Sequence, residues 1–271
     1  MAEADQAAGR KDVAHLALLA SEAAGFTWEV EGWRTVGRLL LDIGAWSTAR
    51  RVRERLRKVE GSDAFASKDG TAPAPLAHAL VFAGHMVDDK GRTPPRFPET
   101  CVAAARREMW RSLADLRPTV GIAASASGGD ILFHEICAEL AIPTDMRLVL
   151  PPEQFVNLSV VKAGVEWERR FWALVERKRR EHRFAQLGEG KELPGWLQDK
   201  PDYTIWTRAN LWLLECALSL DPATLTVMAL WDGKESDGPG GTAHLVHRAQ
   251  ALGANMLVLD TQRICPPAGA T

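Results

Sequence analysis

Cysteine is scarce in this sequence, and no two cysteines are close enough to form a C-x-x-C pair. The zinc sites and redox centres that use such pairs are therefore excluded. The four cysteines, Cys101, Cys137, Cys216 and Cys265, are widely spaced, and three of them fall in predicted helices. We expect core thiols in a reducing cytosol.

Long hydrophobic runs and an excess of one charge are also missing. The longest apolar run near the start, at 14–20, is short, has no basic leader and is followed by Ser and Glu, so it predicts neither a signal peptide nor a membrane span. Lys and Arg number 33 against 35 for Asp and Glu, a net charge of −2 that indicates no nucleic-acid or anionic-membrane partner. We therefore expect a soluble, cytoplasmic protein without a membrane or nucleic-acid partner.

The first part of the chain is predicted to be helical. Residues 1–60 form a helical hairpin or small bundle, and 33–59 resembles one degenerate tetratricopeptide-type helix pair. Because one such pair cannot bury its own apolar face, we expect it to pack on the next domain or on a second copy, forming a homo-oligomer through the helical segments. The basic run at 50–58 is a solvated helix face or an anion-binding surface. Residues 61–75 are rich in Gly, Ser, Ala, Asp and Pro without a period, which predicts a linker.

From residue 76 onward, short apolar runs alternate with amphipathic helices, which is typical of a parallel sheet covered on both faces. We predict an α/β fold, with a Rossmann-like parallel sheet and helices on both faces over 76–265, after the small helical N-terminal segment and before a tail at 266–271. The predicted strands are 79–83, 119–124, 146–150, 225–231 and 256–260, with a weaker one at 183–187, and the predicted helices are 101–116, 131–140, 165–182, 207–218 and 242–252.

Ligands of such sheets bind at the carboxyl ends of the strands, so the loops that leave the strands should hold the site. Two of these loops carry a glycine-rich turn into a helix, at 125–130 and 237–242, and neither is the G-x-G-x-x-G of an NAD-type site. A purely structural turn with Asp130 as cap is the alternative for the first. Two helix N-termini beside one cleft favour an anionic ligand. The predicted ligand-binding residues are Gly84, His85, Ser125, Ser127, Gly128, Gly129, Asp130, Arg208, Asp237, Gly238, Gly240, Gly241 and Thr242.

Carboxylates near this edge are candidates for catalysis or for holding a hydroxyl group. The catalytic candidates are Asp88, Asp130 and Glu135. His85 and Asp88 share a loop, and His244 and His247 share a helix, but no three metal-ligand residues occur at a recognised spacing. We expect neither a metal nor a cofactor.

Three motifs together resemble the SLOG superfamily of Rossmann-like nucleotide-binding domains. They are Gly84-His85-Met86 after the first strand, Ser127-Gly128-Gly129-Asp130 after the second, and Gly238-Pro239-Gly240-Gly241-Thr242 after a strand that ends in Trp. The resemblance spans about 80–261 and is closest to the SLOG-like domains of bacterial tetratricopeptide and signalling proteins. It implies a ligand with a nucleotide-like phosphate and ribose, held by Ser127, Gly128 and Gly129 on one side and by Gly240, Gly241 and Thr242 on the other.

The sequence departs from the catalytic members of that group. In the lonely-guy phosphoribohydrolases, glutamates needed for cleavage follow the glycine motif, whereas here Thr242 is followed by Ala243, His244 and Leu245. This favours a nucleotide-binding, sensor-type protein. The alternatives are a nucleotide hydrolase or N-glycosidase that uses a non-standard carboxylate, and a scaffold that has lost its ligand.

Overall fold

The computed structural model describes residues 2–10, 12–23, 78–220, 225–236 and 238–266. The chain divides into two compact units, Met1–Leu76 with Leu214–Thr224, and Ala77–Leu213 with Leu225–Thr271. The predicted helix pair at 33–59, with its basic run, and the predicted linker at 61–75 lie outside the described residues, as does the tail beyond 266. In the first unit, α1 (Ala2–Gly9) and α2 (Val13–Ala23) pack against each other, and Leu16 and Leu18 of α2 are buried.

The second unit is built on a six-stranded sheet in the order β4-β3-β2-β1-β5-β6, in which every neighbouring pair is parallel. The strands are β1 (Ala79–Gly84), β2 (Val120–Ala123), β3 (Thr144–Leu148), β4 (Phe184–Gln186), β5 (Thr226–Trp231) and β6 (Asn255–Asp260). The predicted α/β, Rossmann-like parallel sheet is confirmed, including its weak sixth strand.

The central strands are buried on both faces of the sheet. Ala79, Leu80, Val81 and Phe82 of β1 are all fully buried although successive side chains of a strand point to opposite faces. Both faces are therefore covered, which is why the strands consist of apolar runs and do not alternate with polar residues.

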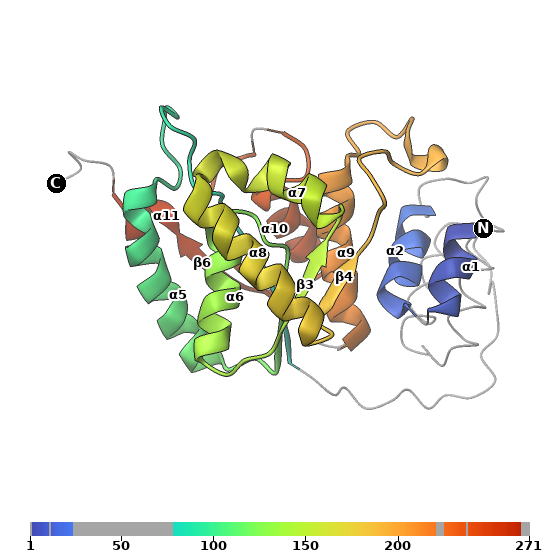
Figure 1. The fold of residues 1–271 in the computed structure, drawn as a ribbon, viewed down its shortest axis with the longest axis horizontal. Helices are drawn as coiled ribbons and strands as arrows, with labels where there is room; N and C mark the ends of the chain where they lie inside the picture. The colour runs from blue at the N-terminus through green and yellow to red at the C-terminus, as the bar shows by residue number, and fades with distance from the viewer. Residues whose placement is uncertain (1, 11, 24–77, 221–224, 237, 267–271) are drawn as a thin grey trace. The chain divides into compact units, whose positions relative to one another are not determined.

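The helices follow the strands in alternation (Figure 1). α5 (Val102–Leu116), α6 (Gly129–Glu139) and α8 (Val165–Arg180) lie next to one another, and α6 packs on β1, β2 and β3. α10 (Thr242–Ala251) packs on β5, β1 and β6. The remaining elements are α7 (Pro152–Ser159), α9 (Ile205–Leu220), α11 (Thr261–Ile264) and the 3₁₀ turns at Glu99–Cys101, Val161–Ala163 and Gly195–Leu197. Of the described helices, none combines the length and the apolar character needed to cross a membrane.

Helix α7 corrects the sequence prediction, which has no helix between the strand at 146–150 and the helix at 165–182. Proline is tolerated at the first helical position, where its missing N–H would have no partner, and Pro152 occupies that position. Phe155, Val156 and Ser159 then repeat at helical spacing and are buried. The two prolines therefore begin a helix.

The cysteines also differ from the expectation of four core thiols. A disulfide joins Cys101, at the start of α5, to Cys265, just after α11. Cys137 and Cys216 are free and buried, as expected. Burial raises the pKa of the Cys137 thiol to about 12, so it stays protonated and unreactive at neutral pH.

Candidate functional site

The site lies where the strand order reverses. From β1 the connections run outward through β2 and β3 to β4, and the chain then returns to place β5 on the other side of β1. A parallel sheet opens a crevice at the carboxyl ends of such a pair of strands. A cavity of about 380 Å³ lies there. Its lining residues are Phe82, Ala83, Gly84, His85, Met86, Arg96, Ala124, Ala126, Asp130, Arg147, Val149, Phe155, Leu158, Ser159, Trp206, Ala209, Asn210, Leu213, Ser236, Gly238, Pro239, Gly240, Gly241 and Thr242.

The first glycine turn, between β2 and α6, packs tightly against the end of β1. Gly128 has a φ of +95°, and a Cβ there would lie 2.8 Å from both the His85 carbonyl oxygen and the Val87 nitrogen. A Cβ on Gly129 would lie 2.9 Å from the Gly84 Cα. Both positions need glycine because backbone meets backbone, and the turn faces the cavity through Ala124, Ala126 and Asp130.

Asp130 connects the two strand ends at the floor of the site. Its Oδ1 accepts a hydrogen bond from the Gly84 N–H and its Oδ2 from the Ala126 N–H, both at 3.2 Å. Burial raises the pKa of this carboxyl to about 7, although the hydrogen bonds from Ala126 and Gly84 favour the ionised form. Near neutral pH, Asp130 is therefore a carboxyl group that can both give and take a proton.

The raised pKa predicts a pH-dependent stability. The folded state binds the Asp130 proton more tightly than the unfolded chain, whose carboxyl pKa is near 3.8. This contribution is complete below about pH 4 and is lost as the pH rises through about 7. Between pH 5 and pH 8 we expect the wild-type free energy of unfolding to fall by about 2 to 3 kcal/mol relative to that of Asp130→Asn. Urea titrations of both proteins across this range measure the difference, and parallel curves would contradict it.

Buried His134, on α6, fixes the end of β2. The Ala124 carbonyl can only accept, so His134 Nε2 carries the proton and donates to it at 2.8 Å, while Nδ1 accepts from the Thr144 hydroxyl at 2.7 Å. Burial lowers the pKa of His134 to about 3, so the ring is neutral. It holds Ala124 in place at the cavity wall.

The second glycine turn precedes α10 and is held against α9. Gly240 has a φ of +86°, and a Cβ there would lie 2.4 Å from the Thr207 nitrogen. The Asn210 Nδ2 donates to the carbonyl oxygens of Gly240 at 2.8 Å and Gly241 at 3.0 Å. The start of α9 therefore sets the conformation of this turn.

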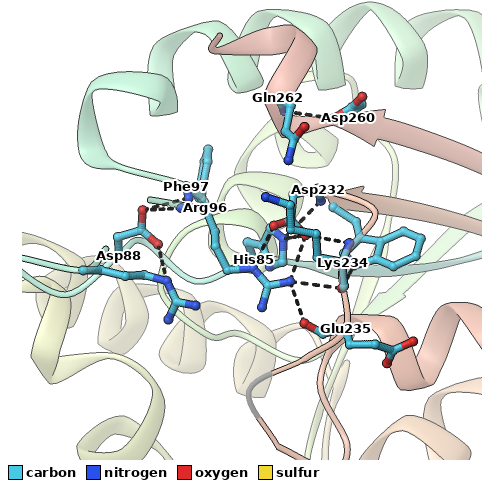
Figure 2. A network of polar contacts seen from close by, with 11 residues as sticks. His85, Asp88, Arg96, Phe97, Asp232, Lys234, Glu235, Asp260 and Gln262 are labelled. Atoms are coloured by element: carbon cyan, nitrogen blue, oxygen red, sulfur yellow. Dashed lines mark hydrogen bonds and ion pairs between the residues drawn. The ribbon is translucent and has the colours of Figure 1, made fainter. Parts of the chain in front are cut away.

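A charged network lies beside the cavity (Figure 2). Asp232, at the end of β5, accepts two hydrogen bonds from the Arg96 guanidinium, at 2.8 and 2.9 Å, and lies 3.0 Å from the Nε2 of His85. Arg96 also donates to the carbonyl oxygens of Lys234 and Glu235. The network ties the loop that follows β1 to the loop that carries the second glycine turn.

Asp88 holds Arg96 from the other side. Its Oδ2 accepts the backbone N–H groups of Arg96 at 2.8 Å and Phe97 at 2.9 Å, and its Oδ1 pairs with Arg92 at 3.5 Å. The carboxylate is therefore occupied by the loop that presents Arg96 to Asp232, which is a positioning role.

The network sets the protonation of its members. Burial alone would raise the pKa of Asp232, but the hydrogen bonds from Arg96 and the Lys234 N–H, together with His85, hold it well below its usual range. Burial lowers the pKa of His85, and the Arg96 charge lowers it further against the opposing effect of Asp232. At neutral pH, Asp232 is therefore ionised and paired with Arg96, and His85 is neutral.

The structure brings together members of both predicted glycine turns. Seven of the predicted ligand-binding residues line the cavity, namely Gly84, His85, Asp130, Gly238, Gly240, Gly241 and Thr242. Five others, Ser125, Ser127, Gly128, Gly129 and Arg208, are near but outside its lining, and Asp237 lies outside the described residues. Of the catalytic candidates only Asp130 lines it.

Glu135 lies away from the cavity. It faces outward from α6, where Arg170 donates to its Oε1 at 2.8 Å and to its Oε2 at 2.7 Å, and Arg106 lies 3.7 Å from Oε2. The sequence prediction placed Glu135 at the edge of the sheet where the ligand binds. It lies five residues after Asp130 on α6, however, and faces the surface between α5 and α8.

The polar lining residues that the sequence did not predict include Arg147 and Ser159. Arg147 was passed over because the predicted third strand begins at 146 and reads as a buried run, whereas β3 alternates between buried and partly exposed residues. Ser159 lies at the end of the missed helix α7. The alternation of Thr144, Met146 and Leu148 with Asp145 and Arg147 is the signal that identifies Arg147.

Among the described residues there is no group of three or more His, Cys, Asp or Glu side chains that could hold a metal ion. No protein-family model matches the chain, and a search of the curated proteins finds no relative. The function is therefore inferred from the cavity and its chemistry.

Proposed function

We propose that this protein binds a nucleotide or a nucleotide derivative between its two glycine-rich turns and acts as a sensor-type binding protein. The observation that carries the proposal is that two turns more than 100 residues apart in sequence line one cavity at the point where the strand order reverses. A volume of about 380 Å³ lies within the range of small-molecule sites.

The start of α10 supplies the anion-binding end of the site. Gly241 caps this helix without a side-chain hydrogen bond, and its first turn has no acidic residue. The first N–H bonded back is that of Leu245, so within the described chain the N–H groups of Thr242, Ala243 and His244 have no partner. In contrast, α6 carries Asp130 in its first turn. The favourable place for a phosphate is therefore beside Thr242.

Part of the cavity wall is aromatic. Phe155 and Trp206 both line it, and their rings meet edge to face with centroids 6.0 Å apart. Phe82, stacked on Phe133 at 4.7 Å, lines it from β1. An anion-binding helix N-terminus and an aromatic wall suit a molecule that has a phosphate and a flat ring.

A charge placed at the start of α10 tests the anion site. Thr242→Glu is expected to weaken binding of AMP at least about 10-fold, because a carboxylate would occupy the place of the phosphate at the N-terminus of the helix. Isothermal titration calorimetry with AMP measures the effect. Gln250→Glu adds the same charge to the exposed far end of α10 and should leave the affinity unchanged. Equal losses in the two variants would count against a phosphate at Thr242, and failure of AMP, ADP and cyclic dinucleotides to bind the wild type would overturn the proposed function.

A nucleotide N-glycosidase is the second candidate, and the buried Asp130 favours it. This residue lines the cavity with a pKa near 7, which suits a group that transfers a proton. Release of free base from AMP that disappears in Asp130→Asn would support this activity. Because the glutamates that follow the glycine motif in the phosphoribohydrolases are absent after Thr242, we place binding without catalysis ahead of this activity.

Self-association through the N-terminal helical segments and a cytoplasmic location remain predictions from the sequence. Size-exclusion chromatography of the full-length protein with light scattering measures its oligomeric state and so tests self-association. A monomer at micromolar concentration would contradict it.

A further inference from the structure

Two polar side chains in the cavity have hydrogen-bonding groups that the described part of the chain leaves unused. Ser159, at the end of α7, is 7% exposed, and Asn210, on α9, is 9% exposed. Both line the cavity. Neither the Ser159 hydroxyl nor the Asn210 Oδ1 has a partner among the described residues, and neither atom is sealed from solvent. Solvent in the cavity reaches both atoms, and a ligand that displaces this solvent must offer hydrogen bonds in its place, so the pair is suited to a ligand with polar groups.

The orientation of the Asn210 amide is fixed by its neighbours. Its Nδ2 lies 2.8 Å and 3.0 Å from the Gly240 and Gly241 carbonyl oxygens, which can only accept hydrogen bonds. The Nδ1 of His244, 3.2 Å away, is a further acceptor for the same group. Oδ1 is therefore the unused atom, and it offers an acceptor to a ligand that carries an N–H or O–H group.

The surroundings of the two residues identify the kind of ligand group. Ser159 shares α7 with Phe155, and Asn210 shares α9 with Trp206, so each helix contributes one aromatic ring and one polar atom to the wall. Phe155 stacks on Phe171 at a centroid distance of 5.9 Å. A flat ring with donors and acceptors at its edge satisfies both the aromatic surface and the polar atoms.

We propose that Ser159 and Asn210 determine the specificity of the cavity by hydrogen bonding to the edge of a nucleobase, while the phosphate binds at the start of α10. This inference rests on the proposed function and names the part of the ligand that these two residues recognise. Asn210 accepts from the base and at the same time holds the Gly240-Gly241 turn. Base recognition and the shape of the anion site are therefore coupled through one amide.

The test compares nucleotides with a probe that has no base. Calorimetric titrations of the full-length protein use AMP, GMP, CMP, UMP and ribose 5-phosphate. We expect at least one nucleotide to bind about 10-fold more tightly than ribose 5-phosphate. In Ser159→Ala that nucleotide should bind about 10-fold more weakly, with the affinity for ribose 5-phosphate unchanged. The thermal midpoint of this variant should not fall, because the Ser159 hydroxyl has no partner in the described part of the chain.

Ser112→Ala, the same substitution on α5 outside the cavity lining, is the matched control and should leave all affinities unchanged. Ribose 5-phosphate binding as tightly as every nucleotide would overturn the specificity proposal and leave the anion site standing. An equal loss for both kinds of probe in Ser159→Ala would also overturn it. If none of the five probes binds, and ADP and cyclic dinucleotides do not bind either, the proposed function fails, and the specificity proposal fails with it.

Discussion

Replacing Gly240 by alanine is expected to lower the free energy of unfolding by about 3 to 5 kcal/mol, from the sum of backbone strain and overpacking. The residue has a φ of +86°, which is unfavourable for any side chain, and a new Cβ would lie 2.4 Å from backbone atoms of Trp206 and Thr207. Neither neighbour can turn away, because both contacts are made by the main chain at the start of α9. Urea denaturation followed by tryptophan fluorescence measures the loss.

Gly91 provides a matched control for this variant. It has the same φ of +86°, but no atom lies within 4 Å of the position of its Cβ. Gly91→Ala should therefore show the strain alone, about 1 to 2 kcal/mol. If the two variants lose the same stability, the contact between the glycine turn and α9 contributes nothing. Gly240→Ala should also weaken AMP binding in the fraction that remains folded, because the start of α10 would move.

The second large effect is expected from the charged network. Asp232→Asn keeps the size of the side chain and removes its charge, which abolishes the buried ion pair with the Arg96 guanidinium. The Asp232 side chain is 2% exposed and that of Arg96 is 11% exposed, so water cannot replace the lost ion pair. We expect a loss of about 3 to 5 kcal/mol in the free energy of unfolding at pH 7.

Acid should remove the same contribution from the wild type. Because the folded state holds the Asp232 pKa below its usual range, this stabilisation is present above the carboxyl's ordinary pKa and is lost as the pH falls below it. The difference between the wild type and Asp232→Asn should therefore narrow in acid. Glu108→Gln is the control, because it breaks an exposed ion pair: the Glu108 side chain is 47% exposed and that of its partner Arg111 is 69% exposed. The free energy of unfolding should fall by less than about 0.5 kcal/mol in this variant. A small effect of Asp232→Asn, comparable to the control, would contradict a buried ion pair.

The sequence was sufficient to predict the sheet because its signals are local. The run at 79–83 is short and apolar and is followed by an amphipathic helix, and the same alternation recurs along the chain, which is typical of buried parallel strands. The missed helix α7 shows the limit of such reasoning, since Pro151 and Pro152 indicate a chain reversal equally well. Deciding between them needs the packing of Phe155 against Phe171, which is a tertiary contact.

The sequence predicted two glycine-rich turns in loops that follow strands, and members of both turns line one cavity in the structure. Its electrostatics could not be predicted, since Arg96 and Asp232 are separated by 136 residues and neither belongs to a motif. The disulfide between Cys101 and Cys265 spans 164 residues, and the sequence alone does not favour that pair over any other. Long-range pairing of single residues is information that only the folded chain contains.

The position of β5 beside β1 has a consequence for synthesis of the chain. Leu80 pairs with Thr226, so one edge of β1 must wait for about 145 further residues to be made, while its other edge pairs with β2 at Val120 far sooner. During that interval the unpaired edge of an apolar strand is exposed, which is a hazard for aggregation. Protection of the nascent chain is therefore most needed between translation of β2 and of β5, and the cavity between the two glycine turns exists only after that interval has ended.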